Sequence, residues 1–207
     1  NKNGLIETVA SGIPRIDFQG NTKGALLLEP QRTNNLLQSN QFDTTWALNS
    51  ATLTGGQIGV GGSNDAWKLT STAINSRVFQ FVNESAAQTI SIYAKAGTLD
   101  FLRLYAGTAS GFASVFFNLS NGTVGIVSSL VDSYSITNVG NGWYRCSISY
   151  DETSTNVRVY GAIANGDTTN TSGNIYIQHA QLEAGSYATS LINTSGSPVT
   201  READVCN

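Results

Sequence analysis

The chain has 207 residues, a formal net charge of −3 and only 12% charged residues. This length is enough to bury a core without stabilising disulfide bonds, and the negative net charge argues against nucleic acid as the main partner. No apolar run approaches the roughly 18 residues that a membrane-spanning helix needs. Because the sequence contains no methionine, we expect the chain to be a piece of a longer protein.

Residues 1–33 are predicted to form a lead-in that packs on the main domain. It holds two short strands, at 4–9 and 14–18, and then a buried strand over 25–29 that Pro30 ends.

The segment 36–46 follows, and its apolar residues at 36–37 and 42–46 predict a loop with a short irregular helix that covers one end of the sheets. Trp46 is either an anchor of this loop or an exposed platform. Trp67 and Trp143 are expected to be packing residues.

From residue 52 onward, β-type runs recur at the spacing typical of a sandwich. Turn signals separate them, among them Asn121-Gly122 and Asn141-Gly142, because Asn and Gly both tolerate positive φ. No stretch shows a helical period, so antiparallel sheets of ten to twelve strands are expected. The runs cover residues 52–60, 65–70, 77–82, 88–95, 99–106, 113–119, 124–127, 134–139, 143–150 and 157–164.

The last β-rich region, residues 173–192, is expected to close a sheet. Its alternation points Ile175 and Ile177 to the core. Residues 183–186 break the pattern, and 187–192 resume it. The predicted fold is therefore all-β: a two-sheet antiparallel β-sandwich of the jelly-roll type over residues 34–207, forming one domain with the lead-in.

Several segments together carry a resemblance to a known family. They are GALLLEPQRTN at 24–34, 42–46, IYAKA at 92–96, FNLSNGTV at 117–124, GNGWYRC at 140–146, 175–177, AQLEAGS at 180–186 and VTREADV at 199–205. These segments resemble the jelly-roll modules of tailed-phage and prophage tail or tail-fibre proteins, which are similar in fold to carbohydrate-binding modules of the cellulose- and xylan-binding type. The resemblance implies a virion-associated or extracellular sugar-binding module, and it transfers no binding residues.

The residues that usually carry catalysis are sparse, so the chain is not expected to be an enzyme. His179 is the one histidine, and it interrupts the alternation of its strand, which favours a packed histidine over a catalyst. Cys146 is expected to be a buried thiol, without a disulfide to Cys206. One histidine and two distant cysteines argue against zinc.

No cofactor is expected. A structural calcium ion is common in jelly-roll sugar binders, and the candidate oxygen donors for one are Glu29, Glu183, Asp17 and Asp204. However, no dense Asp/Asn loop with ligand spacing accompanies them.

Four strands place a tyrosine with a basic or amide side chain on the face opposite the core, once their aliphatic side is assigned to the core. Flat rings suit the C–H face of a pyranose, and planar or charged donors suit hydroxyls and carboxylates. Alternatively, these strands present an ordinary solvated β face with cross-strand pairs. The candidate ligand-binding residues are Tyr93, Lys95, Arg103, Tyr105, Arg158, Tyr160, Tyr176 and Gln178.

The leading hypothesis is a non-catalytic carbohydrate-binding module of phage origin, with a polysaccharide or cell-surface glycan as partner. Three basic residues among the candidates, in an acidic protein, favour an anionic glycan. The alternative is a structural jelly-roll module of a tail fibre, in contact with fibre subunits and without a ligand of its own. Neither hypothesis includes membrane insertion or nucleic-acid binding.

Overall fold

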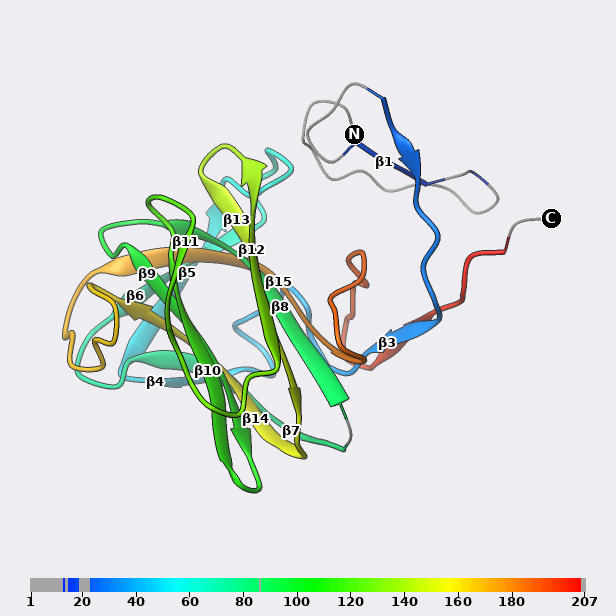
Figure 1. The fold of residues 1–207 in the computed structure, drawn as a ribbon. Helices are drawn as coiled ribbons and strands as arrows, with labels where there is room; N and C mark the ends of the chain where they lie inside the picture. The colour runs from blue at the N-terminus through cyan, green and yellow to red at the C-terminus, as the bar shows by residue number, and fades with distance from the viewer. Residues whose placement is uncertain (1–12, 14, 19–22, 86, 206–207) are drawn as a thin grey trace.

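The computed structural model describes residues 13, 15–18, 23–85 and 87–205, and Figure 1 shows them as an all-β structure. Two six-stranded antiparallel sheets pack face to face as a jelly-roll β-sandwich. The predicted fold class is therefore confirmed. No helix in the described part of the chain could cross a membrane.

One sheet, called the β9/β14 sheet, has the order β11 (Thr123–Val127), β10 (Gly111–Asn118), β9 (Phe101–Thr108), β14 (Ser154–Ala162), β7 (Arg77–Glu84) and β4 (Ala47–Asn49). The other, called the β8/β15 sheet, has the order β12 (Ser133–Gly140), β13 (Trp143–Asp151), β8 (Ala87–Ala96), β15 (Asn174–Ala184), β6 (Ala66–Ser71) and β5 (Ala51–Gln57). The chain crosses between the sheets repeatedly, so neighbours in a sheet are often distant in sequence.

The core lies between the sheets, and strand alternation decides which side chains enter it. Each buried aliphatic side chain contributes about 1.5–3 kcal/mol relative to exposure. The Cys146 thiol is also buried there, and this burial raises its pKa; Cys206 lies outside the described residues. The aliphatic residues predicted to face inward from the central strands are all buried: Ile90, Ile92, Leu102, Leu104, Val157, Val159, Ile175 and Ile177.

The predicted Asn-Gly turns are confirmed by their backbone angles. Asn141 and Gly142, between β12 and β13, have φ of 52° and 78°. Gly122, between β10 and β11, has φ of 73°. Both conformations are left-handed, which is why these residue types occupy them.

The predicted short helix in the segment 36–46 is wrong, because the segment forms a turn and no helix. Its backbone pairs across to the chain near residue 195 instead, through a β-bridge from Gln38. Trp46 is an anchor rather than an exposed platform. Its indole N–H donates to the Gln38 carbonyl at 2.8 Å, and its ring centroid lies 5.0 Å from that of Phe42.

The predicted buried strand at 25–29 is also wrong. Strand β2 covers only Ala25–Leu26, and it pairs with β1 (Ile16–Asp17) alone. The two strands extend away from the sandwich (Figure 1), so Leu26 and Leu28 remain 52% and 54% exposed. The predicted strand at 4–9 lies outside the described residues.

The predicted return to β structure at 187–192 does not occur. Three backbone N–H groups of this segment donate to side chains rather than to a neighbouring strand. The N–H of Thr189 donates to Glu183, that of Ser190 to Glu29, and that of Ile192 to Gln181. The segment is therefore held as an irregular cover.

The two ends of the sandwich lie side by side, because β3 (Arg32–Asn34) pairs antiparallel with β16 (Val199–Arg201). The predicted boundary between lead-in and sandwich falls within β3. Both chain ends leave the sandwich on the same side (Figure 1).

Candidate functional site

The eight candidate ligand-binding residues point outward from the core but divide between two sheets. Arg103 and Tyr105 lie on β9, with Arg158 and Tyr160 beside them on β14. Tyr93 and Lys95 lie on β8, with Tyr176 and Gln178 beside them on β15. Because the sheets stack, the two groups occupy opposite sides of the sandwich and do not form one surface.

The group on β9 and β14 forms a compact cluster of rings and guanidinium groups. Arg158 stands opposite Tyr105 across the strands, and Tyr160 stands opposite Arg103. The guanidinium carbon of Arg158 lies 4.7 Å from the Tyr105 ring centroid. That of Arg103 lies 5.0 Å from Tyr105 and 5.4 Å from Tyr160. At such distances a cation is attracted by the ring face.

Neighbouring strands extend this cluster with residues that were not among the sequence candidates. Phe112 stacks on Tyr105, with centroids 5.2 Å apart and planes 15° from parallel. Phe81 lies on β7, the strand on the other side of β14, and is 75% exposed. We call the whole surface the aromatic–arginine face. It consists of Arg77, Phe79 and Phe81 on β7, Arg103 and Tyr105 on β9, Phe112, Ser114 and Phe116 on β10, and Arg158 and Tyr160 on β14.

The three arginines of this face form no ion pair with any described residue. Arg158 donates its Nε–H to the Asn156 amide oxygen, and the Nε of Arg103 is buried without a partner. Burial, together with the charge of Arg158, lowers the pKa of Arg103, but an arginine stays protonated near neutral pH. The face therefore carries three positive charges without local compensation.

The outer face of the β8/β15 sheet is covered at its centre, whereas Lys95 and Tyr176 stay partly exposed. Tyr93 is 5% exposed and Gln178 is 1% exposed. The Gln178 amide oxygen accepts a hydrogen bond from the Val60 N–H at 2.8 Å. Val60 packs with Tyr93 and with Trp143, which confirms Trp143 as a packing residue. Loop 58–65 thus covers the centre of this face.

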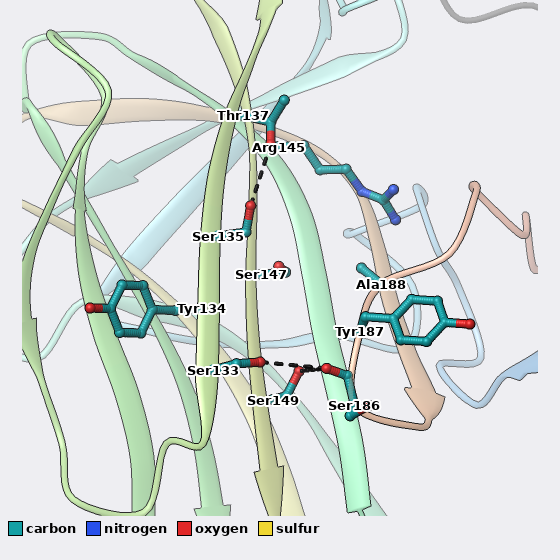
Figure 2. A pocket seen from close by; sticks show the side chains of 10 residues that line it. All are labelled: Ser133, Tyr134, Ser135, Thr137, Arg145, Ser147, Ser149, Ser186, Tyr187 and Ala188. Carbon is teal, nitrogen blue, oxygen red and sulfur yellow. Dashed lines mark hydrogen bonds between the residues drawn. The ribbon is translucent and has the colours of Figure 1, made fainter. Parts of the chain in front are cut away.

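A hollow of about 240 Å³ lies on the same face, between strands β12 and β13 and loop 186–188, and Figure 2 shows the side chains that line it. Serine and threonine hydroxyls line its floor, and the rings of Tyr134 and Tyr187 point away from it on either side. Ser149 already donates to the Ser186 carbonyl at 2.9 Å. Arg145 donates to the Thr189 carbonyl. The hollow therefore has polar groups but no aromatic platform.

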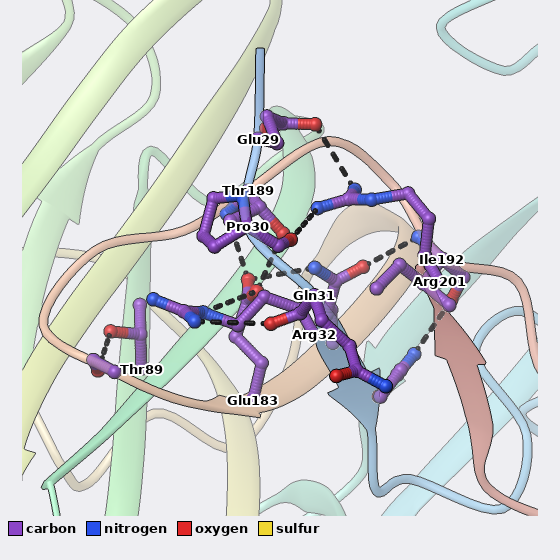
Figure 3. Close-up of polar contacts among 12 residues, drawn as sticks. Glu29, Pro30, Gln31, Arg32, Thr89, Glu183, Thr189, Ile192 and Arg201 are labelled. Carbon is purple, nitrogen blue, oxygen red and sulfur yellow. Dashed lines mark hydrogen bonds and ion pairs between the residues drawn. The ribbon is translucent and has the colours of Figure 1, made fainter. Parts of the chain in front are cut away.

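Two of the carboxylates that were candidates for calcium, Glu29 and Asp204, are held by arginines, and Figure 3 shows Glu29 beside Arg201. Arg15 pairs with Glu29 at 2.6 Å and with Asp204, and Arg201 lies 3.1 Å from Glu29. The Glu29 N–H, with Arg15, lowers the pKa of Asp204.

Glu183 is fully buried and accepts two hydrogen bonds from Thr189, at 2.6 and 2.8 Å. Asp17, the remaining candidate, lies on β1. Within the described ranges, no three metal-ligating side chains gather to hold an ion. The expectation that the chain has no cofactor stays a prediction.

No family model matches the chain, and no curated protein matches its sequence. Among the similar solved structures are a phage tailspike domain and two structures that contain a CBM22-1 module. The tailspike protein 4 enzymatically active domain of bacteriophage CBA120 is 14% identical, with a TM-score of 0.43, over 72% of this chain and 21% of that chain.

The CBM22-1–GH10 modules of Clostridium thermocellum xylanase 10B, complexed with xylohexaose, are 12% identical, with a TM-score of 0.43, over 75% of this chain and 28% of that one. The CBM22-1 xylan-binding domain from Paenibacillus barcinonensis Xyn10C is 11% identical, with a TM-score of 0.38, over 75% of this chain and 94% of that one. The chain thus spans less than a third of the first two and most of the third.

Proposed function

We propose that this chain is a non-catalytic carbohydrate-binding module whose site is the aromatic–arginine face and whose ligand is an anionic polysaccharide. The observation that carries the proposal is a set of three arginines that pair with no carboxylate among the described residues and are interleaved with exposed or half-buried rings on one sheet face. A phage origin and a virion-associated or extracellular location belong to the same proposal.

The chemistry of the face suits such a ligand. Rings such as Phe81 and Phe112 offer flat apolar surface for sugar C–H faces. The guanidinium groups of Arg103 and Arg158 offer charge-assisted hydrogen bonds to carboxylates or sulfates, with a geometry that ammonium groups lack. A shallow face gives modest affinity for each copy, which repetition on a fibre would raise by avidity.

Affinity electrophoresis tests the proposal. Wild-type protein is run through gels that contain alginate, polygalacturonate or hyaluronan, and through gels with neutral xylan or β-glucan. Retardation by at least one acidic polymer is expected, and Tyr105→Ala and Arg158→Ala should each reduce it. Tyr176→Ala and Lys95→Ala, which change the same residue classes on the other sheet, are the matched controls.

The outcomes separate the parts of the proposal. Retardation by neutral polymers alone would contradict the anionic ligand. No retardation in any gel, or equal loss in the control variants, would overturn the site. Release of reducing ends from any polymer would contradict a non-catalytic role.

A structural role in a tail fibre is the second candidate, and the exposed apolar side chains favour it. Phe81 and Phe112 on the aromatic–arginine face are more than 40% exposed, and so are Leu26 at the end of β2 and Leu28 just after it. Such residues also suit contacts with other subunits. Light scattering distinguishes the two: a stable trimer in which the aromatic–arginine face is protected favours the structural role, and a monomer favours sugar binding.

A further inference from the structure

The aromatic–arginine face has one arginine on each of three adjacent strands. Arg77 lies on β7, Arg158 on β14 and Arg103 on β9. Neighbouring strands of a sheet lie about 4.8 Å apart, so a line drawn across these strands meets a new cation at each step of that length. The flanking strands β4, β10 and β11 contain no lysine or arginine. The series of cations is therefore three strands wide.

The three arginines alternate between two rows that run across the strands. Tyr160 stands opposite Arg103, and its ring centroid lies 5.9 Å from the guanidinium carbon of Arg77. Arg77, Tyr160 and Arg103 thus form one row. Arg158 belongs to the next row, two residues along β14, where it stands opposite Tyr105. Each cation therefore has a tyrosine beside it in its own row.

Each of the three arginines keeps one terminal nitrogen that makes no hydrogen bond to any described residue. This nitrogen is Nη2 in Arg77 and Arg158, and Nη1 in Arg103. These three nitrogens reach the surface, whereas the Nε atoms of Arg77 and Arg103 are buried. A guanidinium group has five N–H donors in a planar fork. Each arginine can therefore still donate to a carboxylate that approaches from solvent.

We propose that this face binds a 1,4-linked polyuronate with a carboxylate on every sugar unit, so that three successive carboxylates meet Arg77, Arg158 and Arg103. A pyranose unit in an extended chain advances by about one strand spacing. In a ribbon-like chain successive units are turned over, so their carboxylates point alternately to its two sides, in the same way as the arginines alternate between two rows. The Tyr105 and Tyr160 rings then contact sugar C–H groups.

This inference rests on the proposed function and deepens it, because it specifies the charge pattern of the ligand. A polymer with a carboxylate on every second unit would match Arg77 and Arg103, which lie two strands apart, and would leave Arg158 without a partner. The two patterns can be compared at equal charge.

Titration calorimetry with oligomers of defined length tests the charge pattern. The probes are mannuronate and galacturonate oligomers of two, three and four units, and the hyaluronan hexasaccharide, which carries three carboxylates on alternate units. In at least one uronate series the dissociation constant should fall about tenfold from two units to three, as for one added hydrogen bond to a charged group. It should change little from three to four. The hyaluronan hexasaccharide should bind about tenfold more weakly than the trimer of that series.

Two substitutions separate the end of the site from its centre. Arg77→Gln should reduce the affinity for the trimer to that for the dimer, because two adjacent arginines remain. Arg158→Gln should also weaken the dimer about tenfold, because it leaves no two arginines on neighbouring strands. Lys95→Gln, on β8 of the other sheet, is the matched control and should leave every dissociation constant unchanged.

The outcomes distinguish this inference from the proposed function. Equal or undetectable affinity for dimer and trimer in both uronate series, while acidic polymers still retard the chain in gels, would overturn the inference alone. Hyaluronan hexasaccharide that binds as tightly as the trimers would do the same. Binding of no oligomer, together with no retardation by any acidic polymer, would overturn the proposed function itself.

Discussion

The outer faces of the two sheets have the same sequence pattern, but the centre of only one of them is covered. On β9 and β14, tyrosine and arginine alternate with core residues and remain accessible beside exposed phenylalanines. On β8 and β15, tyrosine alternates in the same way, yet Tyr93 is buried under loop 58–65. The difference shows that alternation determines which side of a sheet a residue occupies, whereas distant segments determine whether solvent or a ligand reaches it.

The covering segments depend on the buried carboxylate of Glu183, and its removal should have the largest effect. Glu183→Ala leaves Arg32 without its carboxylate and removes the acceptor for Thr189. A cost of about 3–5 kcal/mol in the free energy of unfolding is expected, because two hydrogen bonds to a charged group are lost and each contributes about 1.5–3 kcal/mol. Urea denaturation measures it, with exposed Glu202→Ala as the control. Proteolysis within 186–192 should increase; a loss below about 1 kcal/mol would contradict the role given to Glu183.

Matched tyrosine truncations compare the two faces directly. Tyr93→Ala removes a buried ring and should cost about 3 kcal/mol of unfolding free energy while polysaccharide retardation persists at low temperature. Tyr105→Ala should cost less than about 1 kcal/mol and should reduce retardation. Thermal melts and affinity electrophoresis on the same samples provide both readouts. If both variants lost stability equally and kept binding, the faces would not differ as described.

Acid should destabilise the covered side through His179. The pKa of His179 is lowered by burial to about 4, below the value of roughly 6.5 in an unfolded chain. The unfolded chain therefore binds the proton more readily, so this stabilisation is complete above pH 6.5 and is lost as pH falls toward 4. The loss amounts to about 3 kcal/mol at most.

His179→Asn is the matched variant. The backbone of His179 has φ of 50°, and asparagine tolerates this left-handed conformation. Carboxylates elsewhere titrate in the same pH range, so the informative quantity is the difference in unfolding free energy between wild type and variant from pH 7 to pH 4. Parallel curves would contradict a buried neutral imidazole.

The smallest effect is expected at the edge of the open face. Phe81→Ala should change stability by less than about 0.5 kcal/mol, because the ring is 75% exposed. Binding to an acidic polymer should weaken by on the order of 1 kcal/mol, or about fivefold. Ile74→Ala, at a 55% exposed residue between β6 and β7, is the control. Equal effects of the two changes would remove Phe81 from the site.

The alternation of single strands could be predicted from the sequence, and the assignment of strands to sheets could not. Inward and outward residues of β8, β9, β14 and β15 follow from the two-residue period. Both sheets contain strands of the same pattern, and the chain crosses between them, so a local pattern carries no information on which strands are neighbours.

The flanking aromatics were missed for a related reason. β10 has apolar residues at almost every position from 112 to 117, so its period could not separate the inward Val115 and Phe117 from the outward Phe112 and Phe116. On β7, Val78 and the buried Gln80 face inward, against the expectation that an amide side chain points to solvent. The covering loops depend on single long-range hydrogen bonds, such as that from Val60 to Gln178, which leave no trace in a local pattern.

The antiparallel pairing of β3 with β16 has a mechanical consequence. Both flanking segments leave from the Arg32–Arg201 end of this pair. Tension applied between residues 31 and 202 would therefore peel the pair open one rung at a time rather than shear all its rungs together. The Arg201–Glu29 ion pair joins the two segments at this end and separates first, and the core strands bear no load until the β3–β16 pair has separated. Under such a pulling force the sandwich yields first at the β3–β16 pair, while the aromatic–arginine face keeps its shape.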